Sequence, residues 1–210
     1  MFNGKRIVVG VSGGIAAYKA AELVSRLRKA GADVHVVMTA NAGNFVGKLT
    51  FQSLSGNPVH VDMFGESKLG GIEHIELSQK ADLIIIAPAT ANVIAKAAVG
   101  IADDLLSTLL LAHTAPVLLA PAMNSQMYIN PATQANLCRL REYGYQISEP
   151  NQGFLACGTE GPGRMAEPAE IFAQAQAVLS PQRQLAGKTV LVTAGGTQEA
   201  IDPVRFIGNR

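Results

Sequence analysis

Polar side chains that can bind a ligand follow an apolar run near the middle of the chain. Residues 115–120 read APVLLA, a pattern typical of a strand buried on both faces, and residues 121–128 then read PAMNSQMY. Asn124 can both donate and accept hydrogen bonds, and Met123 and Met127 offer soft apolar walls to a flat ring or a sulfur-bearing ligand. Asn124 is equally well explained as the N-cap of a short helix. At this point both interpretations stay open.

A second candidate site follows the first predicted strand, residues 6–11 (RIVVGV). Ser12, Gly13 and Gly14 interrupt this apolar run, and the next residues carry apolar side chains at helical spacing until Gly31. A strand, a glycine turn and a helix N-terminus together favour a bound phosphate, although the spacing matches neither the dinucleotide-binding nor the P-loop fingerprint. The alternative is a tight turn that merely needs glycine. We favour phosphate because Ser12 adds a hydroxyl group.

Two further predicted strands are also followed by small polar side chains. Thr39 and Asn41 come after residues 33–38, and Thr90 and Asn92 come after residues 83–87 (LIIIA). Because the carboxyl ends of parallel strands meet at one edge of a sheet, these groups are expected to face one crevice. Hydroxyl and amide groups suit an uncharged polar cofactor ring with one phosphate better than a metal ion. No His, Cys, Asp and Glu cluster has ligand spacing, so we expect no metal site.

Two side chains are candidates for acid–base chemistry. His74 opens the segment HIELSQKAD and has a side chain that titrates near neutral pH, as a general base requires, although a single histidine is more often a surface or capping residue. Cys157 lies in residues 149–167, a glycine-rich segment predicted to be a long irregular flap. Its thiol could act as an acid or nucleophile, and an incidental loop cysteine is the alternative.

The remaining segments predict an α/β protein with a parallel sheet. Further short strands are expected at 59–61 and 145–148, and helices at 131–144 and 168–179. Cys138 is expected on the inner face of the helix at 131–144. The helical segment 101–113 is apolar nearly all round, so we expect it to be buried, against another subunit.

Composition narrows the possible functions. The chain has 210 residues, 48% of them hydrophobic, which fits one compact domain plus a fragment of another. A net charge of +1 and 5% aromatic residues argue against nucleic acid as a partner. Two cysteines fit a reducing compartment, and the N-terminus lacks a signal-peptide pattern. No apolar run is long enough to span a membrane, so the predicted location is cytoplasmic.

The last 30 residues begin with a polar linker and then show the pattern of a new strand and turn. A polar linker is followed by residues 188–193 (KTVLVT), a predicted strand, and then by the turn AGGT, which mimics the first strand and turn of the chain. This stretch is too short to complete a fold. It is expected to be the beginning of another domain.

Five motifs, taken together and in order, resemble a known family. GVSGGIAAYK, HIELSQKAD, APATANVIAKAAVGIADDLLS, PAMNSQMY and ACGTEGPGRMAEP closely resemble the phosphopantothenoylcysteine decarboxylases, which are homo-oligomeric flavin-containing cysteine decarboxylases. The resemblance covers residues 4–180. The tail resembles the opening of phosphopantothenoylcysteine synthetase, which bacteria commonly fuse to the decarboxylase.

The resemblance implies an architecture. Residues 1–180 would be an FMN-dependent decarboxylase domain, 181–187 a linker and 188–210 the truncated start of a synthetase domain without ligase activity or CTP binding. The family fold is a Rossmann-like, flavodoxin-type parallel sheet with helices on both faces. Family members form homotrimers, often four of them in a dodecamer, with FMN at subunit contacts.

The resemblance also implies roles for individual residues. The catalytic residues would be His74, Asn124 and Cys157, and the substrate-binding residues Asn124, Met127, Ala156 and Gly158. The expected FMN-binding residues lie in the matching motifs: Ser12, Gly13, Gly14, Ile15, Thr39, Phe45, Thr90, Ala91, Asn92 and Ala122. Tyr128 stands where many members have tryptophan, which is expected to alter packing rather than abolish activity.

The implied reaction converts 4'-phosphopantothenoylcysteine to 4'-phosphopantetheine in coenzyme A biosynthesis. Oxidation of the substrate thiol to a thioaldehyde places a C=S group β to the carboxylate, CO2 leaves to give an enethiolate, and FMNH2 returns the electrons. His74 would be the base, Asn124 would hold the carboxylate and Cys157 would supply a proton. The rivals are decarboxylation of a peptide's C-terminal cysteine, prenyl transfer to FMN, and a non-catalytic regulatory subunit that binds a phosphatase.

Overall fold

The computed structural model describes residues 2–63, 73–154, 158, 160–180, 189, 191–192, 195–196 and 198–208. The side chains of residues 73–76 lie outside this description. The chain divides into two compact units, residues 1–180 and 181–210.

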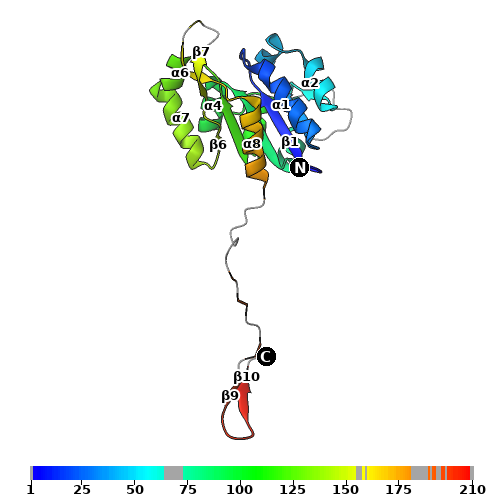
Figure 1. Cartoon of the computed structure of the whole chain (residues 1–210), viewed down its shortest axis with the longest axis vertical. Helices are drawn as coiled ribbons and strands as arrows, with labels where there is room; N and C mark the ends of the chain where they lie inside the picture. Colours follow the sequence, from blue (N-terminus) through cyan, green and yellow to red (C-terminus); the bar gives the residue numbers. More distant parts are fainter. Residues whose placement is uncertain are drawn as a thin grey trace. The chain divides into compact units, whose positions relative to one another are not determined.

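Six parallel strands form the central sheet of the first unit, in the order β3-β2-β1-β4-β5-β6 (Figure 1). The strands are β1 Arg6–Val11, β2 Asp33–Met38, β3 Val59–His60, β4 Leu83–Ala89, β5 Val117–Pro121 and β6 Gln146–Ile147. With the two-residue edge strand β3 set aside, the order is that of a flavodoxin-type sheet. The predicted Rossmann-like parallel sheet is therefore confirmed.

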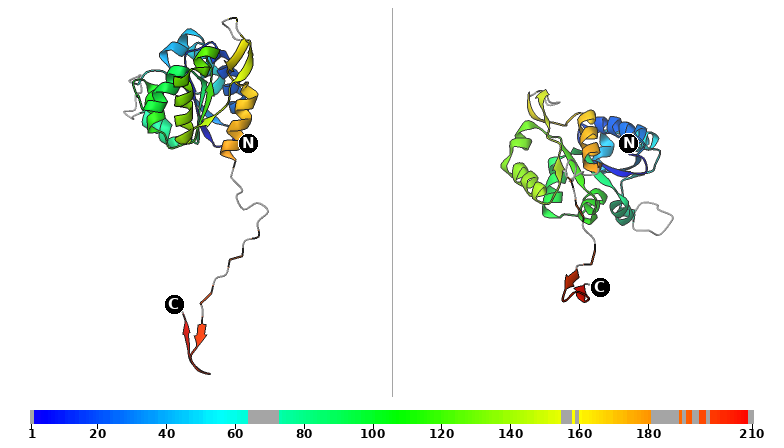
Figure 2. Two further views of the ribbon diagram at one scale, coloured as in Figure 1. Left: turned by 90° about the vertical axis from the view of Figure 1, so that its left-hand side faces the viewer. Right: turned by 60° about the horizontal axis from the view of Figure 1, so that its bottom comes forward.

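Helices cover both faces of this sheet (Figure 2). One face is covered by α1 Ala17–Lys29, α2 Lys48–Ser55 and α8 Pro168–Leu179. The other is covered by α3 Glu73–Lys80, α4 Ala91–Val99, α5 Leu105–Ala112 and α7 Pro131–Glu142. Two short elements, η1 Ala40–Asn44 and α6 Ser125–Ile129, follow β2 and β5.

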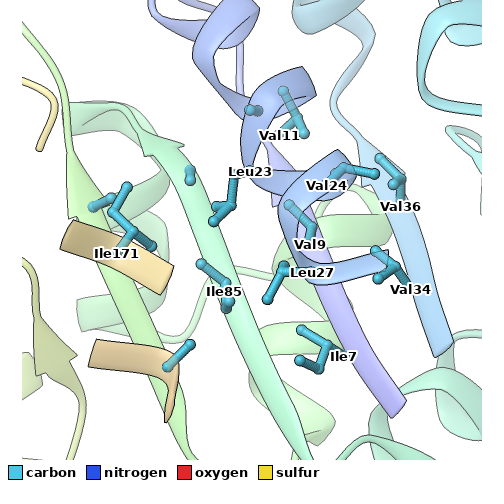
Figure 3. Close-up of a cluster of buried hydrophobic side chains, with 14 of the residues drawn as sticks. Ile7, Val9, Val11, Leu23, Val24, Leu27, Val34, Val36, Ile85 and Ile171 are labelled. Carbon is cyan, nitrogen blue, oxygen red and sulfur yellow. The ribbon is translucent and has the colours of Figure 1, made fainter. Parts of the chain in front are cut away.

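The strands are apolar throughout because both of their faces are buried. In β1, Val9 points toward α1, where it belongs to the same cluster as Leu23 and Leu27 (Figure 3). The neighbouring Val8 belongs to the cluster on the opposite face of the sheet. Every residue of β4 is buried in the same way. This two-sided core holds the carboxyl ends of the strands in fixed positions.

The segment predicted as an irregular flap contains a β-hairpin. β7 Asn151–Phe154 pairs antiparallel with β8 Glu160–Arg164, and α8 begins soon after β8. The sequence hides these strands because NQGF and EGPGR contain glycine and proline and lack an alternating apolar pattern. The prediction that all of 149–167 is irregular was wrong.

Two predictions about helix faces need correction. Cys138 is exposed, because α7 buries Leu137 and Leu140 and the residue after Leu137 is rotated toward solvent. The segment 101–113 is buried only in part. α5 begins at Leu105, while the side chains of Ile101 and Leu111 are 47% and 62% exposed.

The second unit contains a small antiparallel hairpin, β9 Gln198–Ala200 with β10 Phe206–Gly208. Asp202 closes its turn by accepting the backbone N–H groups of Val204 and Arg205. The strand predicted over 188–193 is not formed at the described residues Thr189, Leu191 and Val192. Leu191 and Val192 are largely exposed, which leaves that apolar run without the burial that a central strand needs.

Candidate functional site

A cavity of about 840 Å³ opens at the carboxyl ends of β1, β2, β4 and β5. β1 and β4 are neighbours in the sheet although two strands separate them in sequence, so the cavity lies at a topological switch point, where open α/β sheets bind ligands. Figure 1 shows α6 and β7 at this same end of the sheet. Predicted site residues that line the cavity are Ser12, Gly13, Gly14, Ile15, Thr39, Thr90, Ala91, Asn92, Ala122, Asn124 and Met127.

Ser12 shapes the cavity through its hydroxyl group. The O–H group donates a hydrogen bond to the carbonyl of Pro88 at 2.7 Å, and its oxygen accepts one from the backbone N–H of Thr90 at 3.1 Å. Ser12 is 1% exposed, so this hydroxyl is committed to joining the end of β1 to the end of β4. The sequence argument placed the hydroxyl on the anion itself, whereas its observed partners are in the protein.

Backbone N–H groups remain available beside Ser12. Within the described part of the chain, no acceptor is recorded for the N–H groups of Gly13, Gly14 and Ile15, which precede α1. Gly13 is required by close approach, since a Cβ there would lie 2.6 Å from the Cβ of Asn41. We call residues 12–15 the cradle. Successive N–H groups before a helix are the donors that bind phosphate groups.

Thr39 contributes a further polar atom. Its Oγ1 is buried and has no hydrogen-bond partner among the residues that the structure describes. A buried hydroxyl without a partner is costly, and a ligand atom in the cavity would satisfy it. The cradle and Thr39 therefore fit a ligand that carries a phosphate and hydroxyl groups.

Asn124 is the N-cap of α6 and also lies in the cavity lining. Its Oδ1 accepts the backbone N–H of Gln126 at 2.8 Å and so caps α6, and its side chain also lines the cavity.

Strand β8 closes one side of the cavity by docking on the residue before Asn124. The backbone N–H of Met123 donates to the carbonyl of Gly163 at 3.0 Å. Gly163 has a φ of +121°, and a Cβ there would collide with the carbonyl oxygen of Met123. Only glycine fits this contact.

Lys19 is a site residue that the sequence reasoning missed. It is 6% exposed and lines the cavity, and its Nζ donates to the carbonyl of Met165 at 3.2 Å and to Glu167 at 2.8 Å. Hydrogen bonding from Lys19 holds the pKa of Glu167 below its usual value. A signal was available, because Lys19 falls at i, i+4 and i+8 spacing with the buried Leu23 and Leu27.

Lys96 and Asp104, which also line the cavity, belong to an ion cluster that the sequence reasoning missed as well. Lys96 donates to Asp103 and Asp104, and these hydrogen bonds raise the pKa of Lys96. Burial opposes ionisation of Asp104, but the hydrogen bonds from Lys96 and Ser107 outweigh it and lower the pKa of Asp104. The Lys96–Asp104 ion pair links α4 to the N-terminus of α5, which Asp104 caps.

Tyr128 packs at the edge of the core and ends in a polar contact. Its hydroxyl donates to Glu149 at 2.9 Å, and Arg141 binds the other oxygen of the same carboxylate. Desolvation, followed by the bond to Glu149, raises the pKa of Tyr128 to about 12. The link ties α6 to the chain just before β7.

Some predicted site residues are not brought to the cavity. Phe45 is 47% exposed and does not line it, and Gly158 is exposed and does not line it either. The side chain of His74, which lies in the first turn of α3, and both Ala156 and Cys157 lie outside the described residues.

The described residues contain no group of three or more His, Cys, Asp and Glu side chains placed to hold a metal ion. Nor do they contain a helix with the length and apolar character needed to cross a membrane.

A protein-family model described as "Flavoprotein" matches residues 1–180, the unit that contains the cavity. The chain belongs to the flavoprotein family. A second model, the C-terminal domain of the DNA/pantothenate metabolism flavoproteins, matches residues 185–210.

Two curated relatives of this flavoprotein carry the same name. The coenzyme A biosynthesis bifunctional protein CoaBC of Haemophilus influenzae is 53% identical over 99% of the chain, and that of Bacillus subtilis is 52% identical over the whole chain. In both cases the match covers 52% of the relative. The chain therefore spans about half the length of the curated relatives it matches.

Solved structures agree with the family assignment. A phosphopantothenoylcysteine (PPC) decarboxylase variant bound to pantothenoylaminoethenethiol is 34% identical with a TM-score of 0.74, over 82% of this chain and 97% of that one. The FMN-dependent cysteine decarboxylase SpaF is also 34% identical, with a TM-score of 0.75, over 85% and 97%.

Proposed function

We propose that this flavoprotein uses FMN to decarboxylate 4'-phosphopantothenoylcysteine to 4'-phosphopantetheine, a carboxy-lyase step of coenzyme A biosynthesis in the cytoplasm. The observation that carries the proposal is the cavity at the switch point, which is lined both by the cradle of N–H donors and by Asn124, the residue proposed to bind the substrate carboxylate. The names of the relatives and of the solved PPC decarboxylase support the choice of substrate.

The cavity suits FMN on structural grounds. The N–H groups of the cradle would hold the phosphate, and Thr39 would meet a hydroxyl of the ribityl chain. Thr90, Ala91 and Asn92 at the start of α4 would contact the ring system. Bound FMN supplies reversible two-electron chemistry to the substrate thiol, so that no external reductant is consumed.

The protein's own residues would perform the remaining tasks. In the proposed sequence, His74 removes the thiol proton as the substrate is oxidised to a thioaldehyde. The bond to the carboxylate carbon then breaks, and its electron pair moves onto the C=S group to give an enethiolate. Asn124 orients the carboxylate through a neutral amide, so that CO2 leaves without an ion pair to break. Cys157 donates a proton when the electrons return.

The assembly and the tail complete the proposal. Apolar side chains around the cavity are exposed in the single chain, among them Ile15 at 60%, Tyr18 at 61% and Met127 at 49%. We propose that further copies of the chain bury these side chains in a homotrimer, assembled as a dodecamer, with FMN at the subunit contacts. We further propose residues 1–180 as the decarboxylase domain, 181–187 as a linker and 188–210 as the start of a synthetase domain.

A peptide with a C-terminal cysteine is a second candidate substrate, because the FMN-dependent cysteine decarboxylase SpaF matches the fold as well as the PPC decarboxylase does. The match of residues 185–210 to a pantothenate-metabolism domain favours 4'-phosphopantothenoylcysteine.

The first experiment is an absorbance spectrum of the purified protein, followed by denaturation and identification of any released cofactor. A yellow protein that releases FMN is the expected result. Turnover of 4'-phosphopantothenoylcysteine and of a cysteine-ended peptide is then measured by mass spectrometry. A protein that is colourless after incubation with FMN and removal of the unbound cofactor would contradict the proposal.

A further inference from the structure

A second cavity, of about 530 Å³, is lined by residues of α4, α5 and α7 and by the chain that follows α5 and α7. Its volume falls in the range of small-molecule sites. Ala97, Ala98 and Leu110 supply an apolar part of the lining. Within the described part of the chain, Lys96 is the one residue that lines both this second cavity and the first cavity, at the carboxyl ends of the strands. A ligand in the second cavity would therefore lie close to a side chain that also faces the first.

Aromatic side chains form another part of the lining of the second cavity. Nδ1 of His113 donates to the carbonyl of Ala115 at 2.9 Å, and Nε2 lies 3.0 Å from the hydroxyl of Tyr145. The rings of His113 and Tyr145 meet edge to face, with their centroids 5.3 Å apart. Because their polar atoms already bond within the protein, these two side chains offer a ligand mainly ring surface. Tyr143 adds a second tyrosine to the lining, with 61% of its side chain exposed.

The charged groups in the lining of the second cavity are basic. Among the described residues, Lys96, Arg139 and His113 line it, and no Asp or Glu does. Lys96 is already paired with Asp103 and Asp104, whereas no partner of the Arg139 guanidinium is recorded within the described part of the chain. A guanidinium beside apolar walls favours a carboxylate, which it can bind through two parallel hydrogen bonds. α4 ends at this cavity, and the partial negative charge of a helix C-terminus opposes an anion there, so the carboxylate is expected beside α7.

We propose that the second cavity binds a small carboxylate carried on an aromatic group, and that this site is linked to the first cavity through Lys96. The carboxylate pairs with the Arg139 guanidinium, and the ring packs against the tyrosine side chains and the apolar residues of α4 and α5. Binding in the two cavities is coupled, because anions in both share Lys96 as a neighbouring positive charge. The second site does not depend on the proposed function, since it holds whichever substrate the first cavity takes.

The test measures binding of two probes to the FMN-loaded chain by calorimetry. One probe is 3-phenylpropionate, and the other is 3-phenylpropanamide, which has nearly the same shape and no charge. Wild type should bind the acid at least about tenfold more tightly than the amide, because only the acid forms charge-assisted hydrogen bonds. Arg139→Gln should remove this preference. Arg141→Gln removes the same charge from α7 outside the lining, so it is the matched control and should keep the preference.

Three results would overturn the site. Wild-type protein that binds neither probe would do so, and so would an equal preference for the acid in wild type and Arg139→Gln. The third result is a change in oligomer mass on Arg139→Gln, measured by light scattering, which would assign the cavity to a contact with another copy of the chain.

Equilibrium dialysis of the FMN-loaded chain, at constant ionic strength, tests the link through Lys96. Saturating 3-phenylpropionate should weaken FMN binding by at least about twofold, and the amide should leave it unchanged. The effect should level off as the acid concentration rises, because both ligands can be bound at once. An FMN affinity that the acid does not change would overturn the link. An effect that grows without limit would show that the acid competes with FMN in the first cavity, and would overturn the second site.

Discussion

The hydroxyl oxygens of Ser12 and Thr90 lie 3.2 Å apart where β1 and β4 end. Ser12 also accepts the backbone N–H of Thr90, the N-cap residue of α4. The start of α4 is thereby fixed beside the cradle, and the N-termini of α1 and α4 both face the cavity. Two helix N-termini at one cavity favour an anionic ligand there.

Ser12→Ala should destabilise the protein and weaken FMN binding. The Thr90 N–H loses its acceptor in a partly buried site, and we expect the free energy of unfolding to fall by about 1–3 kcal/mol. Urea unfolding with and without FMN measures both effects. Ser180→Ala is the control, because the Ser180 hydroxyl only donates to an exposed helix carbonyl. Equal stability of Ser12→Ala and wild type would show that the Ser12 bonds contribute nothing.

Gly13→Ala should abolish FMN retention. The added methyl group would collide with Asn41, so the cradle would have to open. Gly43→Ala, in the neighbouring η1, places its methyl group in open space and should purify with normal FMN content. The ratio of flavin absorbance to protein absorbance compares the two. A yellow Gly13→Ala protein would contradict the close packing of the cradle.

Gly163→Ala should lower turnover while FMN stays bound. The substitution forces β8 away from Met123 but leaves the cradle untouched. Gly144→Ala shares the strain of a positive φ, at +89°, without any neighbour within 4 Å, and serves as the control for strain alone. Steady-state kinetics of both variants should show a loss of at least about tenfold only at position 163. Equal losses would assign the effect to backbone strain.

Substitutions of Asn124 can separate its two roles. Asn124→Asp keeps an oxygen that caps α6, so stability should hold, but its charge repels the substrate carboxylate and turnover should disappear. Asn124→Ala should lose turnover and also about 0.5–2 kcal/mol of unfolding free energy. Asn130→Asp, at the matching cap of α7, is the control and should stay active. An active Asn124→Asp enzyme would leave only the capping role.

The Lys19–Glu167 pair should make stability depend on pH in the acid range. The pKa of folded Glu167 lies below its ordinary value of 4.5, so its ionisation contributes stability that is present above pH 4.5 and lost as pH falls through the folded pKa. Wild type should therefore exceed Glu167→Gln in urea midpoint at pH 7, with the difference shrinking below about pH 4.5. Glu160→Gln, at an exposed position of β8, is the surface control. A constant difference down to pH 3 would exclude this linkage.

Local pattern was enough to predict the elements whose structure depends on local burial. The apolar run of β4 is buried at every residue, and α8 spans Pro168–Leu179, the range predicted from its sequence. The edge shared by Ser12, Thr90 and Asn124 followed from a single rule, that parallel strands end on the same side. That part of the site was predictable because it depends only on the direction in which the parallel strands run, and not on contacts between residues far apart in the sequence.

The rest depends on contacts between distant residues. The hydrogen bond from the Ser12 hydroxyl to the Pro88 carbonyl could not be predicted, because the two residues are 76 positions apart in the sequence. β7 and β8 pair through backbone groups, which leave little trace in side-chain pattern. Lys19 was not predicted as a site residue because the burial of its charge depends on Glu167, which is 148 residues away in the sequence. The identity of a buried partner cannot be predicted from helical spacing.

The long separation between Lys19 and Glu167 also governs when the site can appear as the protein is made. The cradle is synthesised before its partners, because Thr90 follows 78 residues after Ser12 and Glu167 follows 148 residues after Lys19. A ribosome adds about 5–20 residues per second, so the residues that complete the cavity are synthesised several seconds or more after the cradle. FMN capture is therefore a late event, and a flavin-loaded chain is one whose first unit has already finished folding.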